Sequence, residues 1–412
     1  MKKYLLLLSA LFLVTSLVYS QIPKYPFPHH TKYTKGSIKP GNFTRKQLDS
    51  ITESFYDAWK ARYLTDSCGG GQYYVNFDED DKEKKISTSE GQGYGMMITA
   101  YMAGHDPQAK TYFDGLYAFC KAHPSSTNGN LMAWCQVEGC VDKTDGGNTS
   151  ATDGDIDIAY ALLLAHKQWG SKGQINYLTE AKNMIDAIMQ DEVNSETWTT
   201  KLCDDIDSSS STYYDTRASD FILDHFRAFY KTTRDKDWLK VIDEDYFLIW
   251  MFQSKFSPQT GLLPDFIEKC NSDPFPAAPH YLESSHDGDY YYNSCRVPWR
   301  IATDYLISGD KRGKDALDII NKWIQLKTNN SPEKINAGYL LNGDAIDRSD
   351  YYSPAFIAPF AVGAMVSRNN QNWLDSLFSY LISSKIEDYR YYDNTIKMLT
   401  LIVLSGNYWS PK

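Results

Sequence analysis

The stretch SATDGDIDIAYALLLAHKQWG, from Ser150 to Gly170, places three aspartates directly before an apolar segment with helical spacing. Asp153, Asp155 and Asp157 occupy alternate positions. One of them is enough to cap a helix that begins near Ile156, because a single side-chain oxygen accepts from a free amide of the first turn. Three neighbouring carboxylates exceed that need, and they indicate a site that directs negative charge at a ligand.

A calcium-binding loop of the EF-hand type is another interpretation of these aspartates. That loop needs glycine at its sixth position and glutamate at its twelfth. Counted from Asp153, these positions hold Ile158 and Leu164, which excludes an EF-hand. Helix capping and a carboxylate site remain open. For Asp157 we expect a solvent-facing position or a structural ion pair.

Apolar residues recur at helical spacing along most of the chain, and strand-like alternation is scarce. The pattern predicts an all-α fold in which about twelve helices form six hairpins that close into a ring. We expect one domain over residues 21–412. The expected helices span roughly residues 48–63, 91–104, 108–122, 155–168, 173–190, 218–231, 236–253, 297–307, 313–327, 354–367, 371–384 and 392–405.

Long irregular segments separate several of the expected helix pairs. They are rich in glycine, aspartate, serine and aromatic residues, and loops of such length in a compact domain are usually functional. A ring of hairpins would gather these loops at one rim. The segments cover roughly residues 65–90, 123–154, 191–217, 254–296 and 328–353.

Residues 1–20, MKKYLLLLSALFLVTSLVYS, have the pattern of a secretory signal peptide. Lys2 and Lys3 form a charged start, an apolar run follows from Leu5 to Val18, and a small-residue cleavage site precedes Gln21. We therefore expect the mature protein to be secreted or periplasmic, with no membrane association once the signal is removed.

The composition excludes several classes of partner and site. The net charge is -10 and becomes -12 when Lys2 and Lys3 leave with the signal, whereas nucleic-acid binding needs a basic face. The seven cysteines are an odd number, so at least one thiol stays free. There is no CxxC pair and no group of histidines near the cysteines, so we expect no metal site and no cofactor.

A second acidic segment is STSEGQGYGMMITAYMAGH, from Ser87 to His105, in which Glu90 precedes Gly91, Gly93 and Gly95. Glycines allow a backbone to approach a ligand closely. A glutamate at a helix start is also stabilised by the helix dipole. Phosphate binding is excluded, because no strand precedes the glycines and a glutamate would repel phosphate. A ligand-facing role and a dipole role for Glu90 remain open.

A third acidic segment is YLESSHDGDYYYNSCRVPWRIATDY, from Tyr281 to Tyr305, with Glu283, Asp287 and Asp289 ahead of two arginines. Like the other two segments, it lies on a long loop before an expected helix. Three such segments fit one site at the rim of a barrel. Two carboxyl groups on either side of a bond are what glycoside hydrolysis requires.

These segments resemble the motifs of glycoside hydrolase family 8. ATDGDIDIAYALLLAHKQW, from Ala151 to Trp169, resembles the family signature of A-[ST]-D-[AG]-D followed by an aliphatic helix that ends in an aromatic residue. SEGQGYGMM resembles the segment that carries the general acid, which implies that role for Glu90. The resemblance extends to YYSPAFIAPFAVGAM near residue 360. It implies an (α/α)6 barrel and an endo-acting, inverting enzyme that cleaves β-1,4-linked glycans.

The chain departs from the family pattern at Asn293. Many family members have an aspartate there as the catalytic base, three residues before the arginine that matches Arg296. An amide does not accept a proton at neutral pH. The loop resembles a subgroup, which includes chitosanases and mixed-linkage glucanases, that takes a glutamate from an inserted loop. Glu283 is therefore the expected base, with Asp289 as the alternative.

Further contacts are expected around these residues. Asp153 would raise the pKa of Glu90 by like charge and stabilise an oxocarbenium-like transition state. Asp155 would contact this site or cap the helix, and Arg296 would orient a carboxylate or form a plain salt bridge. The other expected substrate-binding residues are Trp134, Tyr213, Arg217 and Asp220, whereas Trp299, inside an expected helix, should pack in the core.

The sequence leaves the substrate open among chitosan, mixed-linkage β-glucan and cellulose. Carboxylates around the cleft and the net charge favour a cationic polymer, so chitosan is the expected substrate, with licheninase and cellulase activities as alternatives. A non-catalytic glycan-binding barrel that has lost its base is a further alternative, prompted by Asn293.

Overall fold

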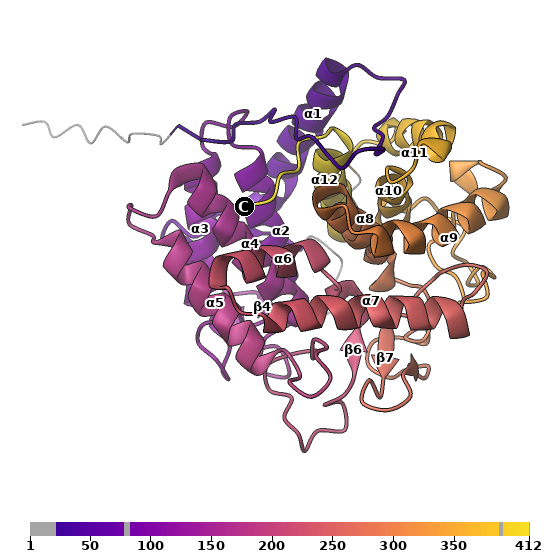
Figure 1. Cartoon of the computed structure of the whole chain (residues 1–412). Coiled ribbons are helices and arrows are strands. Elements are labelled where there is room, and N and C mark those ends of the chain that lie inside the picture. The colour runs from indigo at the N-terminus through magenta and orange to yellow at the C-terminus, as the bar shows by residue number, and fades with distance from the viewer. Residues whose placement is uncertain (1–21, 78–82, 387–389, 412) are drawn as a thin grey trace, which may run out of the picture.

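The computed structural model describes residues 22–77, 83–386 and 390–411; the expected signal peptide at residues 1–20 lies outside them. Within this part of the chain, twelve α-helices form two concentric layers (Figure 1). Each even-numbered helix contacts the next one, and α12 contacts α2, so the inner ring closes. The inner helices are α2 (Ser89–Tyr101), α4 (Thr152–Trp169), α6 (Leu223–Thr233), α8 (Val297–Ser308), α10 (Pro354–Ala364) and α12 (Tyr391–Leu404).

The odd-numbered helices form the outer layer. The first of them packs against α12, and each of the others packs against the inner helix that precedes it in the chain. This arrangement is an (α/α)6 barrel, as expected. The outer helices are α1 (Arg45–Tyr63), α3 (Ala109–Ala122), α5 (Tyr177–Asp191), α7 (Asp237–Lys255), α9 (Lys311–Thr328) and α11 (Gln371–Ser383).

The two layers differ in how their residues are buried. Every residue of α10 is buried, because an inner helix has neighbours on both sides and an outer helix behind it. In α1 the buried residues recur at helical spacing from Leu48 to Tyr63, and the remaining face is polar. An all-round buried helix is apolar on every side, whereas an outer helix needs only one apolar stripe.

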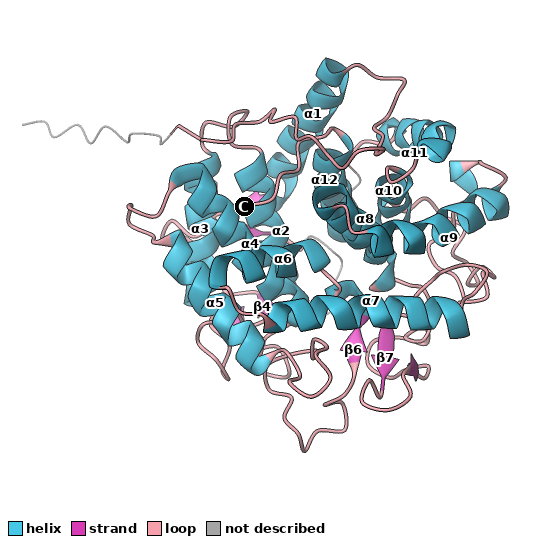
Figure 2. Cartoon of the chain, viewed as in Figure 1, coloured by secondary structure: helices cyan, strands magenta, loops and turns pink. Residues whose placement is uncertain are grey.

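Short antiparallel strands lie in the loops between the helices (Figure 2). They form a two-stranded sheet, β1-β2, and two three-stranded sheets, β3-β4-β5 and β6-β7-β8. The strands are β1 (Leu64–Thr65), β2 (Tyr74–Val75), β3 (Lys85–Thr88), β4 (Cys135–Val137), β5 (Val141–Asp142), β6 (Thr216–Arg217), β7 (Phe266–Glu268) and β8 (Phe275–Pro276). They are too short to be recognised from alternation in the sequence.

All twelve expected helices are present, but two boundaries were wrong in ways that matter. The helix expected at 155–168 begins at Thr152, so Asp153, which was expected ahead of the helix, is its second residue, and all three aspartates lie within it. The helix expected at 218–231 is divided, because a 3-10 turn at Ala218–Asp220 precedes α6.

The start of α2 packs against the start of α4 at two glycines. A Cβ atom built on Gly154 would lie 2.3 Å from the Ser89 hydroxyl oxygen and 2.8 Å from the Glu90 backbone nitrogen. One built on Gly93 would lie 2.7 Å from Cβ of Asp157. These glycines therefore permit a close approach of two helices, whereas the sequence analysis had considered Gly93 for close approach to a ligand.

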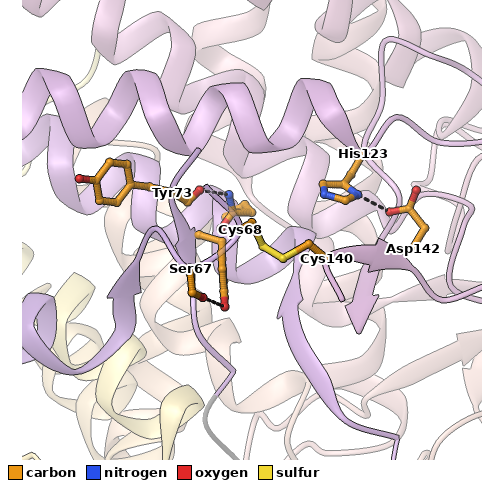
Figure 3. The surroundings of a disulfide bond; sticks show 8 residues. Ser67, Cys68, Tyr73, His123, Cys140 and Asp142 are labelled. Carbon is orange, nitrogen blue, oxygen red and sulfur yellow. Dashed lines mark hydrogen bonds and ion pairs between the residues drawn. A yellow bond between two sulfur atoms is a disulfide. The ribbon is translucent and has the colours of Figure 1, made fainter. Parts of the chain in front are cut away.

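One disulfide, between Cys68 and Cys140, connects the loop after β1 to the turn between β4 and β5 (Figure 3). Beside it, His123 Nδ1 lies 2.8 Å from an Asp142 carboxylate oxygen. The other five cysteines are free, which agrees with the expectation of at least one free thiol from an odd total. The described helices include none with the length and apolar character needed to cross a membrane.

The contact between α2 and α4 predicts that Gly154→Ala is damaging. The added methyl group would overlap the backbone of Ser89 and Glu90, and such overpacking costs typically about 1–3 kcal/mol. We expect a lower free energy of unfolding in urea, together with a fall in activity of about 10²-fold from the displacement of Glu90. Gly173→Ala is the control, because a Cβ there meets no atom within 4 Å. Equal stability of the two variants would contradict the packing argument.

Candidate active site

A cavity of about 620 Å³ opens where the N-terminal ends of several inner helices meet the long loops. Its wall comes from α2, α4 and α12, from the turn before α8, and from the loops that the sequence analysis expected at one rim. The residues are Phe77, Lys85, Thr88, Ser89, Glu90, Trp134, Ala151, Asp153, Arg217, Glu283, Tyr292, Asn293, Arg296, Tyr351, Arg390, Tyr391, Tyr392 and Asp393.

Helical geometry separates the three aspartates that alternate in sequence. At 100° per residue, Asp153 and Asp157 lie on similar sides of α4, one turn apart, while Asp155 lies on another side. Asp153 lines the cavity. Asp157 lies deeper in the barrel, where its two oxygens accept from the Arg300 guanidinium at 3.1 and 2.6 Å. The expected structural ion pair of Asp157 is therefore present, and a solvent-facing position is wrong.

Arg296 connects the acidic groups of the cavity. Its Nη1 donates to Glu90 Oε2 at 2.7 Å and to Asp153 Oδ2 at 2.8 Å. The same nitrogen is 3.1 Å from the Tyr94 hydroxyl oxygen, and Nη2 donates to Asn293 Oδ1 at 2.9 Å. The arginine is 2% exposed. The two roles considered for it, a salt bridge and the orientation of a carboxylate, are therefore compatible, because the same salt bridges fix the carboxylates.

Glu90 is the second residue of α2, and its side chain is 18% exposed toward the cavity. Burial raises its pKa, the Arg296 charge opposes that rise, and the Asp153 charge adds to it; the pKa is about 7. The Tyr391 hydroxyl donates to Glu90 Oε1 at 3.1 Å. Glu90 can therefore hold or release a proton near neutral pH, which is the property of a general acid.

Asp153 has the opposite character. Burial alone would raise its pKa, but the charges of Arg217 and Arg296 outweigh burial and lower the pKa to about 2. Arg217 Nη2 donates to Asp153 Oδ1 at 2.9 Å. Asp153 is therefore ionised beside Glu90, and the two carboxyl groups have divergent pKa values in one cavity.

Glu283 faces the same cavity from the loop between β8 and α8. Its Oε2 accepts from Nδ2 of Asn293 at 2.8 Å. The loop is held by the buried Asp287, whose carboxylate accepts from the backbone amides of Leu282, Glu283 and Ser284 at 2.7, 2.9 and 2.8 Å. Asp287 thus supports the loop rather than the cavity.

Asp289, the alternative base, lies outside the group of residues that line the cavity. Its Oδ2 is 2.9 Å from Nδ1 of His286. Of the two base candidates, the structure therefore brings Glu283 together with Glu90 and Asp153, and it leaves Asp289 in a local ion pair.

Three of the expected substrate-binding residues are also absent from the cavity wall. Asp155 is 0% exposed and accepts from the Met132 amide at 2.9 Å, so we withdraw the expected sugar contact. Burial, and then the neighbouring Glu192 charge, raise the pKa of Asp155 well above its usual value. Asp220 is likewise fully buried and accepts from Arg217 Nε at 3.0 Å. Tyr213 packs against a small apolar cluster near β7.

Of the two tryptophans, Trp134 lines the cavity and Trp299 does not. The Trp134 indole donates to the Gly146 carbonyl oxygen at 2.6 Å, which fixes its ring in the wall. Trp299 is 2% exposed inside α8, and the Arg300 guanidinium lies 4.1 Å from its ring centroid. The expected core position of Trp299 is confirmed.

Sequence reasoning missed the contribution of α12 and its neighbours. Tyr391, Tyr392 and Tyr292 line the cavity, and the Tyr292 hydroxyl is 2.7 Å from that of Tyr351. The only local signal was a run of aromatic residues at a helix start, and such runs also fill cores. Their role becomes visible only when α12 closes the ring beside α2.

An (α/α)6 barrel with paired acidic groups in one cavity has the kind of site that glycoside hydrolases use, whether they invert or retain the configuration. The glycosyl hydrolases family 8 model matches residues 26–406, and the chain belongs to that family. It is an endo-acting glycoside hydrolase, so the alternative of a non-catalytic barrel is set aside.

Relatives agree with this assignment. The chain is 47% identical over 389 residues to a beta-glucanase of Niallia circulans, covering 94% of this chain and 92% of the relative. It is 42% identical over 392 residues to an endoglucanase of Bacillus sp. strain KSM-330, covering 94% and 82%. A solved beta-1,3-1,4-glucanase from Paenibacillus sp. X4 superposes with a TM-score of 0.89 at 47% identity, covering 94% of this chain and all of that one.

The electrostatics of the cavity predict that Asp153→Asn lowers the pKa of Glu90. Removal of the Asp153 charge takes away a like charge that favours protonated Glu90, while the Arg296 charge remains. Carboxyl-carbon NMR of the labelled protein, titrated against pH, measures this change directly. Asp289→Asn is the control, since Asp289 is outside the cavity wall. A Glu90 titration unchanged by Asp153→Asn would contradict the proposed coupling.

Proposed function

We propose that this enzyme cleaves internal β-1,4 bonds of mixed-linkage β-1,3-1,4-glucan with inversion of the anomeric configuration. The main observation behind this proposal is that Glu90, whose pKa is about 7, lines the same cavity as a second acidic residue, Glu283. Arg296 and Asn293 lie between the two groups. This is the division into acid and base that one-step glycoside hydrolysis uses.

In the proposed reaction, protonated Glu90 donates its proton to the leaving glycosidic oxygen as the bond to the anomeric carbon breaks. A water molecule attacks that carbon from the opposite face and transfers a proton to ionised Glu283. Asp153, ionised by its two arginines, stabilises positive charge that develops on the sugar ring. Inversion requires the acid and base carboxyls to be about 6.5–9.5 Å apart, so that water fits between the base and the sugar.

The choice of a neutral substrate rests on the charge of the cavity wall. Its basic side chains are Lys85, Arg217, Arg296 and Arg390, and its acidic ones are Glu90, Asp153, Glu283 and Asp393, which are equal in number, and protonation of Glu90 removes one negative charge. A balanced wall gives a polycation no special attraction. The relatives at 47% identity are named as a beta-glucanase and a beta-1,3-1,4-glucanase, which supports the same choice.

The preference for chitosan is therefore revised. It assumed that the cluster at 153–157 and the loop at 283–289 would surround the cleft with free carboxylates. In the structure Asp155 and Asp157 are buried, Asp287 binds its own loop, and Asp289 is paired with His286. The excess negative charge of the chain lies elsewhere, where it has little influence on a substrate in the cavity.

We also propose that the mature enzyme acts outside the cytoplasm. The signal-peptide pattern at residues 1–20 supports export. The disulfide between Cys68 and Cys140 supports it independently, because structural disulfides persist mainly in oxidising compartments.

The acid role of Glu90 predicts how kcat/KM depends on pH and how Glu90→Gln changes kcat. For the unsubstituted enzyme, kcat/KM should fall as pH rises through about 7, because the general acid must be protonated. Glu90→Gln should lower kcat at pH 6 by about 10²–10⁴-fold with the fold intact by circular dichroism. Substrates with a good leaving group need less acid assistance and should lose less. A loss of activity equal for good and poor leaving groups would contradict the acid role.

The substrate assignment predicts robust hydrolysis of lichenan and barley β-glucan, with little on chitosan. Proton NMR of the first products should show the α-anomer from a β-linked polymer, since a single displacement inverts the configuration. Activity on lichenan should change little between about 0.02 and 0.5 M salt, because a neutral chain has no charge to screen. Faster cleavage of chitosan that weakens with salt would restore the cationic substrate, and a β-anomer would contradict inversion.

A further inference from the structure

Asn293 lies between the two proposed catalytic carboxyls and contacts the groups on both sides. Its Nδ2 donates to Glu283 Oε2 at 2.8 Å, and its Oδ1 accepts from Arg296 Nη2 at 2.9 Å. The other terminal nitrogen of Arg296 donates to Glu90 at 2.7 Å. Asn293 is 6% exposed and is part of the cavity wall. A continuous path of hydrogen bonds therefore runs from Glu283 to Glu90.

The partners of Asn293 determine the orientation of its amide. Arg296 offers only donors, so it needs the amide oxygen; the Glu283 carboxylate offers only acceptors, so it needs the amide nitrogen. The flipped amide would place donor against donor and acceptor against acceptor. An aspartate at the same position could accept from Arg296 but, when ionised, would have no proton to donate to Glu283.

The backbone around Asn293 is also fixed by hydrogen bonds. The carboxylate of Asp265, which is 2% exposed, accepts from the amides of Asn293 at 3.0 Å, Ser294 at 2.7 Å and Tyr291 at 3.0 Å. It also accepts from the Ser294 hydroxyl at 2.7 Å. Four hydrogen bonds to one buried carboxylate leave this segment little freedom, so the amide is presented to Glu283 in one position.

We propose that Asn293 is a positioning residue that holds Glu283 in the orientation and ionised state needed to take a proton from water. The inference rests on the proposed role of Glu283 as base. It assigns a function to an amide that cannot itself exchange a proton in the reaction, and the hydrogen bond to Glu283 is the means.

Other charged groups also face Glu283. Arg217, from β6, and Asp265, ahead of β7, interact with it electrostatically. Arg296 reaches it through Asn293, while Glu90 and Asp153 share the cavity. Asn293→Asp adds a carboxylate within hydrogen-bond distance of Glu283, and two such carboxyls cannot both be ionised without strong repulsion. The pair would then share a proton.

The test compares Asn293→Ala and Asn293→Asp with the unsubstituted enzyme on lichenan. For Asn293→Ala we expect kcat to fall about 10²-fold with KM nearly unchanged, because the base is no longer held. For Asn293→Asp, which preserves side-chain shape, we expect the acidic limb of the kcat/KM profile to move up by about one pH unit or more. Asp289→Asn, on the same loop but outside the cavity wall, should keep the original profile.

Glu283→Ala, with and without azide, separates this inference from the proposed function. If Glu283 is the base, the variant should be nearly inactive and azide should restore turnover by attacking the anomeric carbon, giving a glycosyl azide. A fully active Glu283→Ala would overturn the proposed function. An inactive Glu283→Ala, together with an Asn293→Asp variant that keeps the original pH profile, would overturn only the inference. Thermal unfolding shows which variants are folded, and the shape-preserving Asn293→Asp decides the matter if Asn293→Ala is not.

Discussion

The close contact between the first turns of α2 and α4 is the constraint on which the site depends. Gly154 lies against the backbone of Ser89 and Glu90, and Gly93 lies against Asp157. No larger residue fits at Gly154 without a backbone shift. Because the two helices start side by side, Glu90 and Asp153, each the second residue of its helix, face one cavity. The general acid Glu90 and the ionised Asp153 are therefore neighbours because the backbones of their two helices pack closely.

Two arginines make this concentration of carboxylates tolerable. Arg296, just before α8, pairs with Asp153, and Arg300, in α8, pairs with Asp157 one turn deeper in α4. Buried charges are stable only when they are paired and hydrogen-bonded, since their desolvation is costly. The Arg300–Asp157 pair joins α8 to α4, while Arg296 also pairs with Glu90. The same device that stabilises the barrel thus sets the charge of the cavity.

Much of this was predictable from the sequence because it is local. Apolar periodicity identified all twelve helices, and the spacing of the acidic segments indicated one rim. The paired i, i+4 spacing of the aspartates and arginines was an available signal for these ion pairs, although it did not specify which pairs form. The start of α4 was misplaced because Asp153 and Asp155 resemble capping residues, whereas Thr152 already lies in the helix and Ala151 precedes it without a side-chain cap.

The sequence by itself determined the helical layers, the family motifs and the identity of Glu90, Asp153 and Glu283 as candidates, because helix periodicity and motif spacing act over short distances along the chain. Only the tertiary structure decided which carboxylates share the cavity and which are buried elsewhere. It joined Asn293 to Glu283, left Asp289 with His286, and brought Tyr391 of α12 to Glu90. These outcomes depend on segments up to about three hundred residues apart meeting at one rim. Burial there raises the pKa of Glu90, whereas the Arg217 and Arg296 charges lower that of Asp153.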